Sequence, residues 1–450
     1  MTPLLGIAMA TLGGWFGTAA AADLDVGGNL KLFQVAVFPP DDDLYAPQLA
    51  VPGTLEALDF PLDEDTIRAP SSSSGILVSR LATRLDAGPA TFELHPQLTL
   101  QPSGASSGLT LTQTGTETGQ ALDLTWEIVD DDAVLLQLRV DRLSAAVEGG
   151  PVRATVGRQA ITFGHGMFFS PMDLVNPFLP TSIDQEYKPG VDAARLDAFW
   201  GTAGQATAVS AYQSDWDLDG TVHALYAQTG VGLWDLGVFA GLVRSDVVVG
   251  LSAGGSVGPV GLHADATLTM PDSNDNAGSD AANTSGTSTD EDPFVRAVVG
   301  ADAQVAENTS VAAEVYIQTN GETDAADYRA AYSDTRHSNG ELWLAGRTYA
   351  GLSVNQQLWP VLSGSLFAIV NLEDPSALVG PSLSWSVSDE VTANLGAYAG
   401  LGEGMDPYQV EDWADAEQAF SALIQASMEP QASEFGDMPL AAFASLQAWF

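Results

Sequence analysis

The sequence predicts an all-β protein, a closed antiparallel transmembrane β-barrel of about 18 strands, within a range of roughly 16 to 18. Three observations predict it. Segments in which apolar and polar residues alternate recur along the chain, Gly and Pro residues separate these segments, and long connections alternate with short ones. The 450 residues are enough for one large closed sheet, because all-β barrels exceed the usual domain size as single units.

The composition indicates a folded chain and excludes several classes of protein. Hydrophobic residues make up 45% and charged residues 16%, so the chain can bury a core although its net charge is -43. We expect no nucleic-acid partner, because phosphates require Lys and Arg, and there are only 15 of these beside 58 Asp and Glu. The absence of Cys removes disulfides, CxxC redox chemistry and thiolate metal sites.

Residues 1–22 have the pattern of a signal peptide. An apolar run is followed by Ala-Ala-Ala at 20–22 before Asp23, which fits a signal-peptidase site. The usual positively charged n-region is missing, and the alternative interpretation is a buried N-terminal element. Residues 23–450 then form a single barrel domain, in which no stretch reaches the ~18 consecutive apolar residues of a membrane-spanning helix.

The strands are identified by an alternation of period two. In the stretch TFELHPQLTLQ, Leu94, Leu98 and Leu100 lie on one face, while Gln97 and Thr99 lie on the other. The stretches VAAEVYIQT, LSWSVS and VTANLGAYAGL repeat this pattern. Soluble sandwiches alternate as well, so the alternation alone does not indicate a membrane.

The order of the connections favours a membrane barrel. The predicted strands are 24–37, 75–86, 90–101, 134–147, 151–162, 189–201, 204–213, 220–229, 232–243, 246–256, 259–270, 293–305, 309–319, 341–356, 361–372, 376–387, 390–401 and 437–450. Every long connection follows an odd-numbered strand, and every connection after an even-numbered strand is tight. A barrel whose chain starts in the periplasm sorts its loops in this way, with short periplasmic turns and long outer loops.

Acidic residues concentrate in the predicted outer loops, in tracts such as PPDDDLY, VDDDAV and ETDAADYRAAYSD. One interpretation is attraction of cations, including divalent ions that bridge to anionic lipid head groups; the other is a self-repelling, salt-tolerant surface. The tract DSNDNAGSDAAN resembles a calcium loop, but Ala277 and Asn283 occupy the positions of its Gly and Glu, which argues against a specific site. The tract EDWADAEQAFSALIQ predicts a short helix at the outer mouth.

The C-terminal segment 437–450 has the pattern of a final lipid-facing strand, with Leu440, Leu446 and Phe450 on one face. A terminal aromatic residue on such a strand resembles the C-terminal signature of Gram-negative outer-membrane barrels. The resemblance implies that Phe450 is an assembly signal for the barrel-assembly machinery and that outer-membrane lipids surround the protein. The alternative is a Phe450 buried in a soluble core.

The stretch around residues 150–200 carries the most specific resemblance. A strand ending in GRQ at 157–159 leads into a long third outer loop, 163–188, and then into a strand that contains D-x-x-R at 192–195. This order resembles bacterial porins, both the general and the alginate-export type, although no close relative is evident. The resemblance implies a third loop that folds inward and narrows a channel for small polar solutes.

The charges of this region predict a constriction. Six of the 15 basic residues lie between positions 139 and 195, and the loop adds acids, so opposed charges across a channel would select polar solutes. The candidate residues are Arg139, Arg153, Arg158, His165, Asp173, Asp184, Glu186, Lys188, Arg195 and Asp197. Arg153, Arg195 and Asp197 fall on the polar face of their strands. We assign this face to the lumen, since a lipid-facing Arg at mid-depth costs about 2 to 4 kcal/mol. Arg142 and Arg158 break parity and require a bulge, for instance at Gly157, or a position near the head groups. The alternative is ordinary salt bridges within the wall.

No motif predicts a catalytic centre, a cofactor or a metal. GxSxG, P-loop, GxGxxG and HExxH motifs are missing from any strand-turn-helix context. His165 and the nearby loop acids could be drawn as a metal site, but no second His lies within ligand spacing, so a loop histidine near the rim is the better interpretation.

A barrel of 16 to 18 strands leaves an aqueous channel, so the sequence predicts passive diffusion of small polar or charged solutes, including ions. One alternative is a substrate-specific channel, for an oligosaccharide or a similar solute, in which Phe163, Phe168, Phe169 and Phe178 contact a ring face or anchor the loop. The other is a non-transporting acidic envelope protein, adhesin or secreted sandwich. A homotrimer is left open, because too many strands are rich in Ala for one to mark an interface.

Overall fold

The computed structural model describes residues 22–38, 71–103, 120–131, 133–176, 184, 186–212, 220–272, 292–332, 334–338, 340–404 and 431–450. The predicted signal peptide up to residue 21, most acidic tracts, the calcium-like stretch after Asp272 and the helix expected at 411–425 lie outside these residues. No helix in the described part of the chain is both long and apolar enough to cross a membrane.

The described chain is nearly all β-structure. Its strands are β1 (Asp23–Phe38), β2 (Ser72–Ala87), β3 (Ala90–Pro102), β4 (Thr125–Asp130), β5 (Val134–Gly149), β6 (Val152–Gln159), β7 (Val191–Trp200), β8 (Gly204–Tyr212), β9 (Thr221–Val231), β10 (Trp234–Val243), β11 (Asp246–Val257), β12 (Val260–Met270), β13 (Phe294–Ala306), β14 (Thr309–Gln318), β15 (Thr348–Trp359), β16 (Leu362–Asn371), β17 (Ala377–Ser388), β18 (Val391–Leu401) and β19 (Leu440–Trp449). The short helices are η4 (Ala325–Asp327), α4 (Tyr328–Tyr332) and α5 (Thr335–Ser338).

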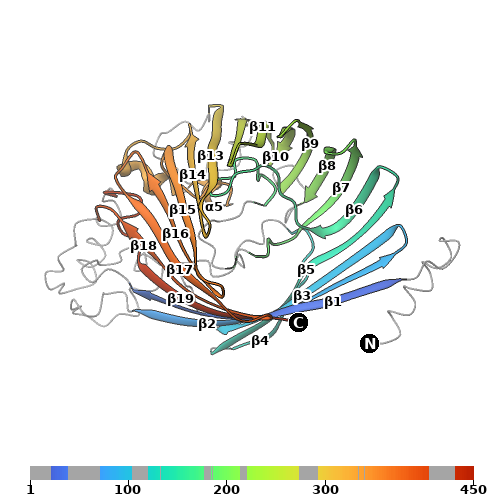
Figure 1. Ribbon diagram of the computed structural model, residues 1–450, viewed down its shortest axis with the longest axis horizontal. Coiled ribbons are helices and arrows are strands. Elements are labelled where there is room, and N and C mark those ends of the chain that lie inside the picture. The colour runs from blue at the N-terminus through green and yellow to red at the C-terminus, as the bar shows by residue number, and fades with distance from the viewer. Residues whose placement is uncertain are drawn as a thin grey trace, which may run out of the picture.

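Eighteen of these strands form one closed antiparallel ring, seen end-on in Figure 1. Each ring strand pairs with its neighbours along the chain, and β1 closes the ring by pairing with both β2 and β19. β4 is the additional strand, and it pairs with β5 alone. Closure leaves the ring without free edges, so the predicted barrel and its strand number are confirmed.

The apolar faces of the strands point out of the ring. Leu94, Leu98 and Leu100 are exposed on the outer surface of β3, whereas Gln97 and Thr99 are buried on its inner side. The last strand follows the same rule, with Leu440 and Leu446 exposed and Ser445 and Gln447 buried. An apolar outer band around a polar interior is the arrangement of a transmembrane barrel, and a sandwich would bury the apolar faces instead.

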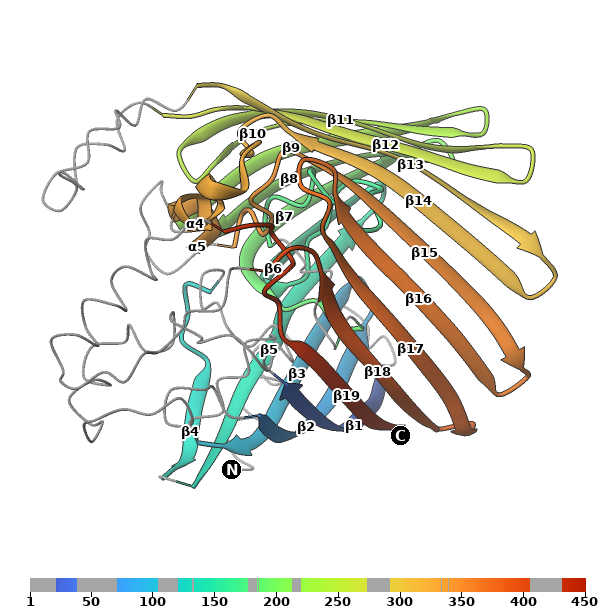
Figure 2. The same ribbon diagram turned by 90° about the vertical axis from the view of Figure 1, so that its left-hand side faces the viewer.

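The two ends of the barrel differ, as Figure 2 shows. At one end, eight turns of two or three residues join the strands, at 88–89, 150–151, 201–203, 232–233, 258–259, 307–308, 360–361 and 389–390. Gly88 and Gly150 have φ angles of 64° and 59°, the left-handed conformation that tight hairpins need. Both chain ends of the barrel, Asp23 and Trp449, lie at this end. The predicted sorting of short and long connections is therefore confirmed.

The structure differs from the sequence prediction at two connections. The strand expected from residue 341 begins at Thr348, because Leu342, Leu344 and Ala345 leave the wall and are buried inside the mouth. β4 was not predicted. It lies beside the outer part of β5, beyond the point where β6 ends. β5 therefore pairs with β6 along 143–149 and with β4 along 135–139.

A bulge in β5 explains the broken parity of Arg142. The register of β3 and β5 skips one residue, because His95 faces Arg142 while Pro96 faces Val140. Asp141 is the extra residue, and both it and Arg142 are buried on the inner side. The bulge that Arg142 requires therefore lies at Asp141 rather than at Gly157.

Candidate functional site

The third long connection, between β6 and β7, lies inside the ring of strands, where Figure 1 shows it as a teal and green coil. Its described residues form two limbs. The outgoing limb, 160–176, follows β6, and the return limb, made of 184 and 186–190, precedes β7. The contacts of the two limbs with the barrel wall define the site.

The outgoing limb is held by two buried carboxylates on β12 and β14, strands that are distant from the base of the loop. Asp265 on β12 accepts backbone N–H bonds from residues 165 and 166, at 2.6 and 2.9 Å. Glu314 on β14 accepts bonds from the backbone of residues 167, 168 and 169, at 2.5, 2.9 and 3.0 Å. Both side chains are fully buried, and His263 bonds Glu314 at 2.7 Å. Charge-assisted bonds of this kind are stronger than neutral ones.

Aromatic packing adds to this attachment. Phe163 contacts Tyr226 and Phe239 of the wall, with ring centroids 4.9 and 5.9 Å apart. Phe169 stacks on Tyr316 at 4.9 Å, and both phenylalanines are buried. Burying a Phe side chain stabilises by about 1.5–3 kcal/mol. Of the two roles considered for the loop phenylalanines, these two rings take the anchoring role, and Phe178 lies outside the described residues.

The return limb is held by basic side chains of β1 and β2. Lys31 on β1 bonds Asp184 at 2.8 Å and Glu186 at 2.7 Å, and the lysine is itself only 1% exposed. The guanidinium of Arg80 on β2 lies over the Tyr187 ring, 3.5 Å from its centroid. Burial raises the pKa of the Tyr187 hydroxyl, which hydrogen-bonds His95 of β3. The limb is therefore tied to three adjacent strands.

A lysine joins the two limbs to each other. Lys188 Nζ bonds both carboxylate oxygens of Asp173, at 2.5 and 2.7 Å, and donates to the carbonyl of Ile161 at 2.9 Å. Burial lowers the pKa of Lys188, and the nearby Asp173 carboxylate partly opposes this. The loop is thus closed on itself as well as attached to the wall.

The mouth carries a further buried polar cluster, made where the outer connections meet the ends of β15 and β16. Glu434 accepts hydrogen bonds from the hydroxyls of Tyr332 and Tyr349, at 2.7 and 2.5 Å, and from the Asn371 amide at 2.7 Å. Burial raises the pKa of the Glu434 carboxyl. Trp343, from the same outer region, stacks on Phe169, so the outer connections rest on the third loop.

Arg158, a predicted constriction residue, lies within the wall. Its guanidinium is fully buried and makes two bonds of 2.9 Å to Asp192 on β7. It also donates to the carbonyls of Val140 on β5 and Leu122 beside β4. The N–H of Leu122 returns a bond to Asp192 at 2.9 Å. The GRQ and D-x-x-R motifs therefore connect β5, β7 and the segment at Leu122 at the point where β6 ends. Arg158 is buried there and does not contact a solute in the lumen.

Seven of the other predicted residues fall into two groups. In the loop, Asp173 pairs with Lys188, whereas Asp184 and Glu186 share Lys31 of β1. Arg153, Arg195 and Asp197 lie apart from it on the inner face near the tight turns, where Arg195 and Asp197 pair at 2.9 Å.

Two residues remain from the predicted set. Arg139 is half-buried on β5, opposite Gln97 of β3. His165 lies against Gly254 of β11, with its ring 3.6 Å from a carboxylate oxygen of Asp265. Within the described ranges, no group of three or more His, Asp or Glu side chains is arranged to hold a metal ion.

Sequence reasoning missed the wall residues that hold the loop, namely Lys31, Arg80, Asp265 and Glu314. Each lies more than 90 residues from its loop partner along the chain. A signal was nevertheless present. Glu314 is the single charged residue of β14, and Asp265 is the single acidic residue of β12, and both have the parity of the polar face.

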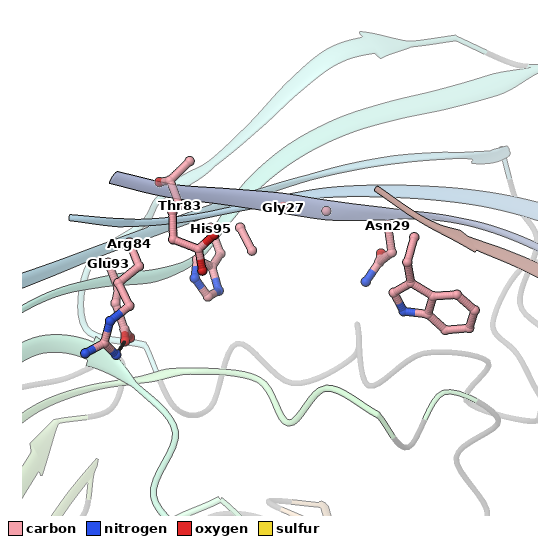
Figure 3. A pocket seen from close by; sticks show the side chains of 10 residues that line it. Gly27, Asn29, Thr83, Arg84, Glu93 and His95 are labelled. Atoms are coloured by element: carbon pink, nitrogen blue, oxygen red, sulfur yellow. Dashed lines mark hydrogen bonds and ion pairs between the residues drawn. The ribbon is translucent and has the colours of Figure 1, made fainter. Parts of the chain in front are cut away.

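Two cavities lie along the inner wall. One, of about 400 Å³, separates Asp184 and Glu186 of the return limb from strands β16 to β19. The other, of about 340 Å³, lies nearer the tight turns, and Figure 3 shows Asn29, Arg84 and Glu93 around it. Both volumes are in the range of small-molecule sites, and both linings combine polar and apolar groups.

Comparisons with known proteins identify the fold. No protein-family model and no curated protein matches the sequence. Among solved structures, the chain is similar to OpdK of Pseudomonas aeruginosa, determined with vanillate, with a TM-score of 0.51 at 9% identity over 95% of this chain and 98% of OpdK. A mutant Rhodopseudomonas blastica porin matches with a TM-score of 0.42 at 10% identity, over 95% of this chain and 100% of the porin. A loop-deletion mutant of Vibrio cholerae OmpT matches with a TM-score of 0.40 at 7% identity, over 96% and 100%. The likeness to OpdK shows that this chain has the fold of an outer-membrane β-barrel porin.

Proposed function

We propose that the protein is a passive channel of a Gram-negative outer membrane. Small polar or charged solutes, ions included, diffuse through its water-filled lumen, and the inward third loop narrows their path. The channel has no turnover and no cofactor. Transport by this mechanism depends only on the width of the passage and the charges that line it.

The size and lining of the barrel support this proposal. A ring of 18 strands is too wide for its own side chains to fill, and barrels of about this size leave an aqueous channel. The inner faces carry polar residues such as Asn29, Gln97 and Thr99, while the outer band is apolar. This contrast also supports an outer-membrane location, with the tight turns on the periplasmic side.

The attachment of the third loop to the wall is the observation that supports a narrowed lumen. Five backbone N–H groups of the outgoing limb bond the buried carboxylates of Asp265 and Glu314, on strands far from the base of the loop. Lys31 then holds the return limb on the opposite side of the ring. A loop fixed at both walls keeps a constant obstruction in the lumen.

The charges of the passage favour cations weakly. Asp184 and Glu186 border the larger cavity, and Lys31, the base that pairs with both, is buried behind them. One positive charge therefore faces two negative ones. The acidic outer tracts of the sequence add a negative potential at the mouth, which concentrates cations there.

Planar-bilayer recordings on detergent-refolded protein test the proposal. We expect single-channel steps of constant conductance, a cation to anion permeability ratio moderately above one, and swelling of liposomes in small sugars and amino acids. Refolding is verified independently by heat-modifiable migration on gels. A folded barrel that gives neither conductance nor swelling would identify a plugged, non-transporting envelope protein.

A further inference from the structure

The longest run of strands without charged residues in the barrel wall lies at its C-terminal end. Across their full described lengths, the five strands β15 to β19 contain no Asp, Glu, Lys or Arg, and the nearby acids lie in the connections between them. The strands on the other side of β1 do carry charges, such as Arg80 on β2 and Arg142 on β5. The inner face of β15 to β19 is therefore neutral, and we call it the neutral wall.

The inner face of this neutral wall presents hydroxyl and amide groups. The hydroxyls of Ser365 on β16 and Ser382 on β17 lie 2.5 Å apart. The Asn394 amide of β18 donates to the Ser445 hydroxyl of β19 at 3.0 Å. A serine hydroxyl both donates and accepts, and an amide carries two donors and one acceptor oxygen, so these groups keep bonding capacity toward the cavity.

Two aromatic rings pack against the same wall, and both contact the ring of Tyr398. Phe367 covers Gly380 of the next strand, where an added Cβ atom would come within 2.0 Å of the ring. Phe443 covers Gly396, where the same distance is 2.4 Å. Because these glycines lack side chains, the rings pack closely against the wall and line the cavity edge together with the hydroxyl groups.

The opposite side of the cavity consists of the return limb. Asp184 and Glu186 line it, and the Glu186 side chain is 50% exposed. Lys31 bonds both carboxylates. It lies beside the cavity because β1 pairs with β19, where Lys31 is opposite Gln447. The cavity of about 400 Å³ is thus built from a rigid acceptor pair, a neutral hydroxyl wall and two apolar ring surfaces.

We infer that this cavity is a binding site for neutral polyhydroxylated solutes, that is, sugars or polyols. This inference rests on the proposed channel and names the solute class that its narrow passage selects. A polyol offers many hydroxyls that donate to the Asp184 and Glu186 carboxylates and exchange bonds with the serine and asparagine groups. The apolar face of a sugar ring packs on Phe367 or Phe443.

Charged solutes fit the cavity less well. An anion meets two carboxylates and finds no cation on the neutral wall, so it is repelled and loses its hydration without a partner. A cation gains from Asp184 and Glu186 and from the ring faces, but it gives up the hydration of a full charge, and the donors of the serine and asparagine groups find no acceptor on it. A neutral polyol uses all three surfaces, and burying it leaves no charge unpaired.

The test is current block by added solutes in planar bilayers, with single channels first shown to conduct. Glucose and linear oligosaccharides of increasing length serve as neutral probes, benzoate as the anionic probe and arginine as the cationic probe. We expect the sugars to block the current saturably and benzoate to have no effect. The variant Asn394→Ala is expected to weaken sugar binding by about tenfold, the value of one or two hydrogen bonds. The control is Ser386→Ala, on the inner face of β17 outside the cavity. Sugars should block this variant as strongly as the wild type.

The outcomes separate this inference from the proposed function. Protein that does not conduct fails as a channel before the sugar experiment begins. Conducting channels that no sugar blocks would overturn the binding site and leave the channel intact. Stronger block by benzoate or arginine than by sugars would also overturn it, as would equal sugar block in Asn394→Ala and Ser386→Ala. Circular dichroism and heat-modifiable migration verify that both variants are folded.

Discussion

The two limbs of the third loop are attached to the barrel in different ways. The outgoing limb is bonded through its backbone, to the buried carboxylates Asp265 and Glu314, and through buried phenylalanine rings. The return limb is bonded through its side chains, by ion pairs with Lys31 and by the Tyr187 ring beneath Arg80.

The difference separates two tasks. Backbone bonds fix the position of the outgoing limb and depend little on which side chains it carries. Side-chain bonds fix the return limb and at the same time set the charge that borders the cavity. Changes in the first anchor should therefore alter the width of the passage, whereas changes in the second should alter its selectivity.

The largest effect is expected from removal of the carboxylate of Glu314. In Glu314→Ala, three backbone N–H groups and His263 lose their acceptor, and each buried unsatisfied group costs about 1–3 kcal/mol. The outgoing limb should then leave the wall, which raises single-channel conductance and speeds liposome swelling in larger sugars. Asp302→Ala, a change of an inner-face carboxylate on the adjacent β13, is the control. Equal conductance in the two variants would contradict the anchoring role.

A selectivity change is expected next, from Lys31→Met. This change leaves Asp184 and Glu186 without their counter-charge, so the cation to anion permeability ratio should rise about threefold at low salt and less at high salt, where screening is stronger. Reversal potentials in a salt gradient measure it. Lys31→Arg keeps the charge and should behave like the wild type. An unchanged ratio in Lys31→Met would mean that the return limb does not border the ion path.

A smaller effect is expected at Tyr187. A guanidinium over an aromatic ring is worth about 0.5–2 kcal/mol, so Tyr187→Leu should loosen the return limb and increase the noise of the open-channel current. Tyr187→Phe keeps the ring and loses only the bond to His95, and its current should resemble the wild type. If the two variants were equally noisy, the hydroxyl rather than the ring would hold the limb.

The smallest effect is a pH dependence from Lys188. Because burial lowers its pKa below the usual 10.5, the unfolded chain binds more protons than the folded one between the two pKa values. The free energy of unfolding should therefore rise with pH in that window, by linkage. Lys188→Met removes this contribution, so the wild type should gain stability relative to the variant as pH approaches 10.5 in denaturant titrations. Parallel pH curves for the two proteins would count against a buried, charged Lys188.

Most of the fold could be predicted from the sequence, since each strand carries its own alternation. Each of the 18 ring strands overlaps a predicted strand, because lipid on one side and water on the other impose the same period along the chain. β4 was missed because its alternation covers only Thr125 to Ile128 and is then broken by Val129, which follows another apolar residue. The start of β15 was misplaced because Leu342 and Leu344 alternate like a strand and yet are buried in the mouth.

The site could be predicted only in part. The position of the third loop and its charged residues Asp173, Asp184, Glu186 and Lys188 follow from local sequence. The pairing partners do not, because the bonds to Asp265 and Glu314 join residues about a hundred or more positions apart. Arg158 was assigned to the channel from its neighbours in sequence, while the end of β6 and the segment at Leu122 decide its place in the wall.

The uncharged strands β15 to β19 have a consequence for how the barrel enters the bilayer. A charged side chain at the bilayer centre costs about 2.5–3.5 kcal/mol on insertion scales, and a half-built sheet exposes its future inner face to lipid tails. These five strands carry no such charge on either face, so they tolerate that exposure better than strands bearing Lys31 or Arg80 do. β15 to β19 therefore form the longest run of strands whose side chains carry no such cost while the barrel inserts.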